Sequence, residues 1–263
     1  MLSLRIGLRL ADLRQPTKKA LHTASGLGAE SVEIDARRTF RPSAMTQSAI
    51  RHLRKTLEDL GLGVAALAYP TRRGYEVIDD LEPRLEGTRA AMRLAYQLGT
   101  PHVVNHIGNI PDAETDPEAW NTLVQSLAEL ARFGQREGAW LTGLTGSAPL
   151  DAVARLREHL PQGGLALAVD AGELVMHRID PADFVRRLGA DVRYAYLSDG
   201  VRDASSGRGM SVPIGRGAVD FPSLLGALEE RGYHGYLTIR TSGSDTPTVE
   251  IEHAMEYVEA LFQ

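Results

Sequence analysis

Short apolar segments alternate with longer amphipathic segments along the whole 263-residue chain. The apolar segments have the length of buried strands and cover residues 4–10, 31–36, 64–69, 102–107, 139–144, 165–170, 192–198 and 236–240. Helical segments follow them near residues 16–25, 45–60, 80–98, 115–137, 149–158, 181–188, 221–231 and 248–261. Strict alternation of strands and helices predicts a parallel sheet covered by helices.

The helix boundaries carry local signals that support this pattern. Asp180 precedes Pro181, which is typical of an N-cap followed by proline in the first helical turn. Leu-Gly pairs end several of the predicted helices, because glycine tolerates the left-handed conformation of a helix C-terminus. These pairs lie at 27–28, 60–61, 98–99 and 188–189, each shortly before the next strand. The absence of a linker predicts one domain over residues 1–263.

The number of strand–helix units decides between two architectures. Eight units in a chain of 263 residues favour a closed (β/α)₈ TIM barrel over an open, doubly wound sheet. The segment LRLADLRQP, at the end of the first strand, also lacks the GxGxxG motif of dinucleotide-binding sheets. The predicted fold class is therefore α/β, a single (β/α)₈ TIM barrel.

Composition excludes several classes of protein. The chain has no cysteine, so disulfides, thiolate metal ligands and a cysteine nucleophile are excluded. The net charge of −5 argues against a nucleic-acid partner bound through bulk positive charge. Arg5 and Arg9 interrupt the apolar N-terminal segment, and no apolar run approaches the roughly 18 residues of a membrane span. We therefore expect no nucleic-acid partner, no membrane partner and, by default, a cytoplasmic location.

Polar residues stand where the predicted strands end, which is where α/β barrels carry their chemistry. Arg240 ends the strand YLTIR, and a charge there is costly unless it is paired or meets a ligand. Glu33 has a structural interpretation as the partner of a nearby arginine, and His106 one as a satisfied histidine of the barrel interior. Asp170 follows the very apolar segment LALAV, which favours a functional role.

Four segments give the chain a recognisable pattern: GAESVEID, LGTPHVVNHIG, LAVDAGELVMHRIDP and the long run from YLSDGVRD to GYHGYLTIR. With them the sequence resembles the sugar phosphate isomerase/epimerase group of the xylose isomerase-like TIM barrels over nearly its whole length. The most specific part is the run across the seventh and eighth strands, with its P-x-G-x-G-x-x-D turn. The resemblance also relates the chain to endonucleases of the deoxyribonuclease IV type.

The resemblance implies a divalent metal, with Mn²⁺, Mg²⁺ or Zn²⁺ as the expected ion. Its ligands would be a glutamate, an aspartate, a histidine and a glutamate from strands five to eight. The ion would polarise a substrate carbonyl while carboxylates move a proton between adjacent carbons. This sequence has Leu144, Asp170, Tyr196 and Arg240 at those positions, so Asp170 alone is retained.

Arg240 cannot ligate a metal, because its guanidinium has no acceptor atom and stays charged. We therefore predict no metal ligands and no bound cofactor. Two roles for Arg240 stay open. It forms a salt bridge with Asp170 in place of the ion, or it binds the carboxylate or phosphate of an anionic substrate. Arg202, Arg208 and Arg216 would make the same loop region basic.

Nine residues at or near the strand ends are candidates for catalysis or substrate binding. The catalytic candidates are His106, Asp170, Glu173 and Tyr196; the substrate-binding candidates are Glu33, Asp199, Arg202, Arg216 and Arg240. The predicted function is that of a sugar or sugar-acid isomerase or epimerase acting by proton transfer beside a carbonyl.

Two other functions are weighed against this one. The alternative is a non-catalytic barrel that binds a sugar-like or anionic ligand, or a partner protein. An abasic-site endonuclease is disfavoured, since the expected histidine ligands are missing. The expected partner is a small sugar or sugar acid, and self-association stays open.

Overall fold

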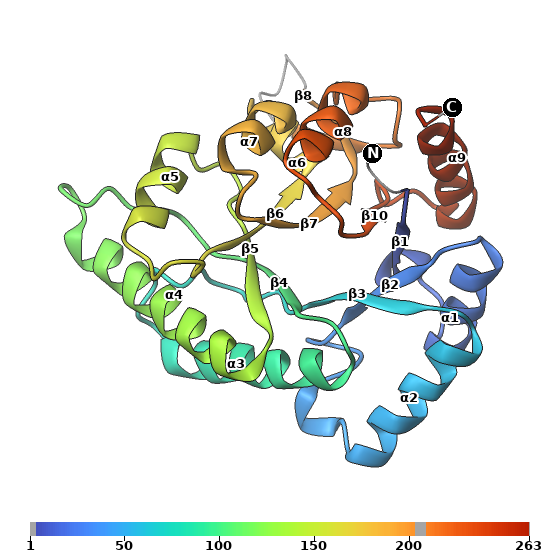
Figure 1. The fold of residues 1–263 in the computed structure, drawn as a ribbon, viewed down its shortest axis with the longest axis horizontal. Coiled ribbons are helices and arrows are strands. Elements are labelled where there is room, and N and C mark those ends of the chain that lie inside the picture. The colour runs from blue at the N-terminus through green and yellow to red at the C-terminus, as the bar shows by residue number, and fades with distance from the viewer. Residues whose placement is uncertain (1–3, 203–208, 263) are drawn as a thin grey trace. The chain divides into compact units, whose positions relative to one another are not determined.

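The computed structural model describes residues 4–202 and 209–262, and all eight predicted strands are present in it. They are β1 (Ile6–Arg9), β2 (Ser31–Asp35), β3 (Gly63–Ala68), β4 (His102–His106), β5 (Trp140–Leu144), β6 (Ala166–Asp170), β7 (Val192–Leu197) and β10 (Leu237–Ile239). They form a closed barrel in the order β1-β10-β7-β6-β5-β4-β3-β2, and the pairings are parallel. The predicted TIM barrel is confirmed (Figure 1).

The predicted helices are also present, with boundaries shifted by no more than a few residues. They are α1 (Thr17–Gly26), α2 (Gln47–Asp59), α3 (Leu81–Gln97), α4 (Pro117–Glu137), α5 (Leu150–Glu158), α7 (Pro181–Leu188), α8 (Phe221–Glu230) and α9 (Pro247–Ala260). Asp180 caps α7 as predicted, since its side chain accepts a hydrogen bond from the amide of Ala182. Asp116 caps α4 in the same way, with Pro117 at the first helical position.

Five short elements were not predicted. They are the 3₁₀ helices η1 (Leu10–Leu13) and η2 (Pro42–Ala44), the helix α6 (Ala171–Met176), and the antiparallel strands β8 (Asp199–Arg202) and β9 (Gly209–Val212). Each is too short to show a hydrophobic period, so the sequence pattern does not reveal it. Within the described residues, no helix combines the length and apolar character needed to cross a membrane.

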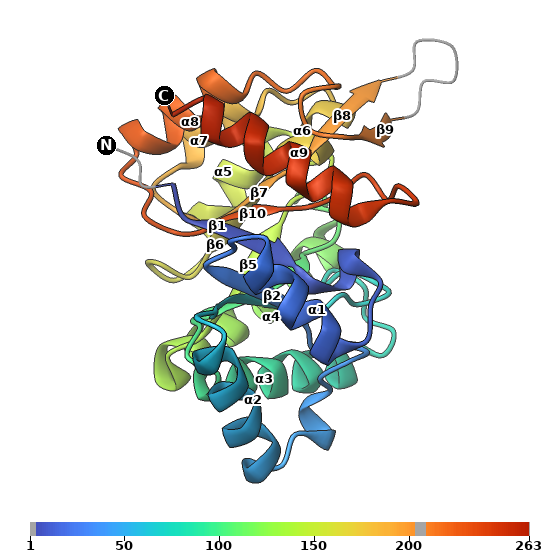
Figure 2. The same ribbon diagram turned by 90° about the vertical axis from the view of Figure 1, so that its right-hand side faces the viewer.

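The chain divides into two compact units. The first comprises residues 1–34, 55–65 and 169–263. In it, β1 pairs with both β10 and β2, α7 packs against α8, and α6 packs against the β8–β9 hairpin (Figure 1). Helix α9 contacts η1 (Figure 2).

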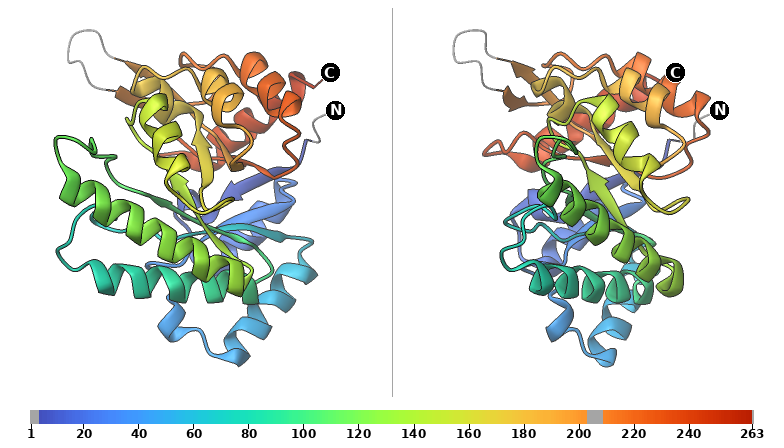
Figure 3. Two further views of the ribbon diagram at one scale, coloured as in Figure 1. Left: turned by 60° about the vertical axis from the view of Figure 1, so that its left-hand side comes forward. Right: turned by 90° about the vertical axis from the view of Figure 1, so that its left-hand side faces the viewer.

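The second unit comprises residues 35–54 and 66–168. In it, β4 pairs with β5, and helices α3 and α4 run side by side, with α4 against β5 (Figure 3).

Candidate functional site

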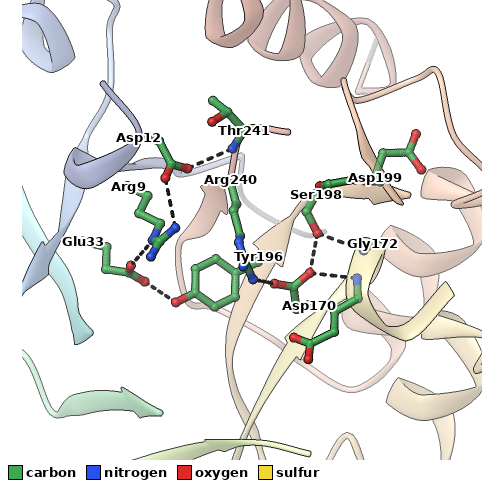
Figure 4. A network of polar contacts seen from close by, with 12 residues as sticks. Arg9, Asp12, Glu33, Asp170, Gly172, Tyr196, Ser198, Asp199, Arg240 and Thr241 are labelled. Carbon is green, nitrogen blue, oxygen red and sulfur yellow. Dashed lines mark hydrogen bonds and ion pairs between the residues drawn. The ribbon is translucent and has the colours of Figure 1, made fainter. Parts of the chain in front are cut away.

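The pairing of β1 with β2 sets the first half of the candidate site. Their register places Arg9, the last residue of β1, opposite Glu33, the middle residue of β2. Arg9 donates from Nε to Glu33 Oε1 at 3.1 Å and from Nη1 to Asp12 Oδ1 at 3.0 Å. Asp12 is carried by η1, and its Oδ2 accepts the amide of Thr241 at 2.9 Å. This network therefore joins the first two strands to the segment that follows β10 (Figure 4).

Glu33 is the buried centre of this network, with 1% of its side chain exposed. Tyr194 and Tyr196 are alternate residues of β7 and so lie on the same face of the strand. Both hydroxyls donate to Glu33 Oε2, that of Tyr194 at 3.1 Å. Burial raises the pKa of Glu33, while Arg9 and the two tyrosines oppose this rise by favouring the ionised form.

The second half of the site is an ion pair between Arg240 and Asp170. Arg240 follows β10 and donates from Nη1 to Oδ2 of Asp170, the last residue of β6. The other oxygen of Asp170 accepts the Ser198 hydroxyl at 2.5 Å and the Glu173 amide at 3.1 Å. The predicted salt bridge between Arg240 and Asp170 is therefore present.

Tyr196 lies between the two halves. Its hydroxyl reaches Glu33, and the guanidinium carbon of Arg240 lies 5.9 Å from the centre of its ring. Figure 4 shows this ring between the carboxylates of Glu33 and Asp170. Burial, followed by the charge of Glu33, raises the pKa of Tyr196 well above 10, so its phenol stays protonated at neutral pH.

The exposed part of this cluster is cationic. The side chain of Arg240 is 37% exposed and that of Arg9 is 29% exposed, whereas Asp170 and Glu33 are almost fully buried. Nε and Nη2 of Arg240 donate no hydrogen bond to any residue that the structure describes. A molecule that approaches the cluster therefore meets guanidinium groups, and that of Arg240 includes N–H donors that no described residue occupies. Such donors suit a carboxylate or a phosphate.

The residues at the implied ligand positions do not fit a divalent metal. Leu144 is apolar and buried, the phenol of Tyr196 is committed to Glu33, and Arg240 places its charge on Asp170. Asp170 is the one carboxylate at these positions, and a nearby guanidinium repels a cation. In the described part of the chain, no three or more His, Asp or Glu residues are grouped so as to hold an ion.

Asp199 has a structural task in the loop that follows β7. Its two carboxylate oxygens accept four backbone amides, those of Gly200, Gly215, Gly217 and Val219, at 2.8–3.1 Å. These bonds hold the turn after β9 against the start of β8. Contact between Asp199 and substrate stays a prediction.

The remaining candidates are more dispersed. Glu173 is half-buried in the first turn of α6, next to the second half of the site. Arg202 and Arg216 are exposed in the region of the β8–β9 hairpin, and neither forms an ion pair with a described residue. Arg208 lies outside the described residues. His106 is exposed at the end of β4, which belongs to the second unit.

Four members of the cluster were not predicted from the sequence: Arg9, Asp12, Tyr194 and Ser198. Arg9 carries the same signal as Arg240, because it is a charged residue at the end of a buried strand. Asp12 follows it by three residues in the same segment. The roles of Tyr194 and Ser198 depend on contacts with other strands and have no local signal.

The chain matches the family model described as xylose isomerase-like TIM barrel over residues 21–261. The chain belongs to this family. The family match confirms the resemblance inferred from the sequence. No curated protein matches the chain.

Solved structures extend the likeness over nearly the whole chain. A xylose isomerase domain protein from Planctomyces limnophilus has 19% identity and a TM-score of 0.84, covering 99% of this chain and 97% of its own. A xylose isomerase-like TIM barrel protein from Mycobacterium smegmatis, in complex with magnesium, has 17% identity and a TM-score of 0.77, covering 98% and 96%. D-Psicose 3-epimerase from Clostridium cellulolyticum H10 has 13% identity and a TM-score of 0.77, covering 99% and 100%. At these identities the likeness shows the fold.

Proposed function

We propose that this protein binds an anionic sugar, in particular a sugar acid, and moves a proton beside its carbonyl without a divalent ion at the strand ends. The observation that carries the proposal is the placement of Arg240. Its guanidinium is held by Asp170, is partly exposed, and has donors without a partner among the described residues. The epimerases among the similar structures support a sugar as the ligand.

Proton transfer beside a carbonyl requires stabilisation of negative charge. When a base takes a proton from the carbon next to the carbonyl, the bonding electrons move to the carbonyl oxygen and give an enediolate. A preorganised guanidinium stabilises such an oxyanion through hydrogen bonds. Return of the proton to the opposite face of the same carbon gives the epimer. Return to the former carbonyl carbon, with transfer of the hydroxyl proton, gives the isomer.

Glu173 is our candidate for the base. It is half-buried rather than sealed, and its amide is hydrogen-bonded to Asp170, so it lies within the Arg240 part of the site. Glu33 is less accessible, and its oxygens already accept three hydrogen bonds. We assign a positioning role to Glu33 and Tyr196: their hydrogen bond fixes the Tyr196 ring beside the Arg240 guanidinium.

One observation favours a second candidate function, a barrel that binds the anionic sugar without chemistry. Each of two buried carboxylates of the cluster, Glu33 and Asp170, accepts three hydrogen bonds from within the chain. These two carboxylates are buried and bonded within the chain, so they are poorly placed to take a proton from a substrate.

Hydrogen exchange separates these two candidates. The protein would be incubated in D₂O with a panel of uronic and keto-aldonic acids, which carry a carbonyl besides the carboxylate, in the presence of EDTA, and carbon-bound deuterium would be followed by NMR. The enzyme hypothesis predicts exchange that falls at least tenfold in Glu173→Gln and in Arg240→Gln, but not in Arg51→Gln, an exposed position on α2. Saturable binding without exchange would favour the non-catalytic barrel. The absence of both binding and exchange across the panel would contradict the proposal.

A further inference from the structure

A separate pocket of about 200 Å³ lies in the second unit, where the chain leaves β2 and β3. It is lined by Arg37, Arg41, Ser43, Tyr69 and Gly87, together with alanine and proline. The described residues that line it include two cations and no acid. Two like charges around one cavity repel each other, and a bound anion would offset this repulsion.

The position of Arg37 is fixed from two sides. Its Nη1 donates to the Tyr69 hydroxyl at 2.7 Å, and its guanidinium carbon lies 5.2 Å from the centre of the Tyr69 ring. Its backbone amide, with that of Arg38, is held by Asp35 Oδ1 at 2.8 and 2.9 Å. The guanidinium of Arg37 therefore contacts an aromatic ring and a neutral hydroxyl, both from Tyr69. Arg41 forms no ion pair with any residue in the described ranges.

A glycine inside helix α3 gives a second, independent observation. A Cβ atom at Gly87 would lie 2.2 Å from the Tyr69 hydroxyl oxygen, so this position has no room for any larger residue while the tyrosine stays in place. Glycine in a helix interior is less favourable than alanine, because it loses more backbone freedom on folding. The absence of a side chain at Gly87 thus leaves room for the Tyr69 hydroxyl, which accepts the hydrogen bond of Arg37.

We propose that this pocket binds a small molecule through a carboxylate or phosphate group. Arg37 and Arg41 supply the charge, and the Ser43 and Tyr69 hydroxyls supply neutral hydrogen bonds. This proposal does not rest on the proposed function, because all of its residues belong to the second unit, whereas Arg240 and its partners belong to the first.

Calorimetric titration of the full chain tests the proposal. The Arg240→Gln variant serves as the background, so that anion binding at the other cluster does not contribute heat. Inorganic phosphate and malonate are titrated separately at constant ionic strength, which tells a phosphate site from a carboxylate site. We expect saturable binding of at least one of the two anions. Arg41→Gln is expected to weaken it at least tenfold, whereas Arg54→Gln, an exposed arginine on α2 with the same charge change, leaves it unchanged.

A further variant tests the geometry rather than the charge. Tyr69→Phe keeps the ring but removes the acceptor that positions Arg37, so affinity should fall several-fold while circular dichroism and the melting temperature show a folded protein. Two results would overturn the proposal. One is the absence of saturable binding for both anions. The other is equal weakening by Arg41→Gln and Arg54→Gln, which would indicate a non-specific charge effect.

Discussion

Arg240 donates from Nη1 to Oδ2 of Asp170, and this bond joins the end of β10 to the end of β6 in the first unit. Asp170 is the one ligand residue that the family resemblance leaves in place, and Arg240 stands at an implied ligand position of its own. The ion pair thus brings a fixed positive charge to the carboxylate that the resemblance implies as a metal ligand. The candidate site is organised around this relationship.

The ion pair should contribute to stability. Arg240→Gln leaves the buried carboxyl group of Asp170 with two of its three hydrogen bonds, so we expect a loss of about 1–2 kcal/mol in the free energy of unfolding. Urea denaturation at pH 7 measures it. Arg216→Gln removes an exposed arginine of the same unit and should change stability by less than about 0.5 kcal/mol. Equal stability of Arg240→Gln and the unchanged protein would mean that the pair contributes nothing to the fold.

Glu33 should make stability fall as pH rises. Burial raises its pKa above the ordinary value of 4.5, so the folded state holds the proton more tightly than the unfolded state. The stabilising contribution is therefore complete below about pH 4.5 and is lost as pH rises through the raised pKa. Burial raises the pKa of Asp12 as well, so Asp12 also makes the free energy of unfolding fall as pH rises.

The matching variant is Glu33→Gln, measured by urea denaturation between pH 4 and pH 8. It should have a shallower decline of stability with pH than the unchanged protein, because the amide does not titrate. If both proteins show the same decline, Glu33 is not the group responsible.

The Tyr196 hydroxyl should matter more at neutral pH than at acid pH. It donates to Glu33 and lowers the pKa of that carboxyl, so it stabilises the ionised form. Tyr196→Phe is expected to cost about 1–2 kcal/mol at pH 7.5 and less at pH 4, as measured by chemical denaturation. Tyr257→Phe, a partly exposed tyrosine on α9, is the control and should show no such pH dependence. A loss that is the same at both pH values would indicate a packing effect rather than support of the carboxylate.

The fold was predictable because its signals are local. Asp180 before Pro181 and the Leu-Gly pairs mark helix ends wherever the tertiary contacts lie. The sequence pattern does not reveal helix α6, since six residues are too few for a hydrophobic period and its N-cap, Asp170, also fits the role of a functional carboxylate.

The candidate site was predictable only in part. The Arg240–Asp170 pair follows from two charged residues at the ends of buried strands in a barrel. The Arg9–Glu33 pair depends on the register of β1 against β2, which places these residues opposite each other. Register is set by packing across the sheet and by turn geometry. The same limit applies to Asp199, whose four amide partners come from a loop whose path the sequence pattern does not reveal.

Metal content is the most direct test of the central claim, that a guanidinium takes the place of a divalent ion beside Asp170. The protein would be purified without chelator, analysed for Mn, Mg and Zn by mass spectrometry, and titrated with Mn²⁺ under electron paramagnetic resonance. Asp170→Asn would assign any binding to this site. The account predicts no stoichiometric ion and no saturable Mn²⁺ binding in the micromolar range. Stoichiometric metal that is retained through purification and lost in Asp170→Asn would contradict it.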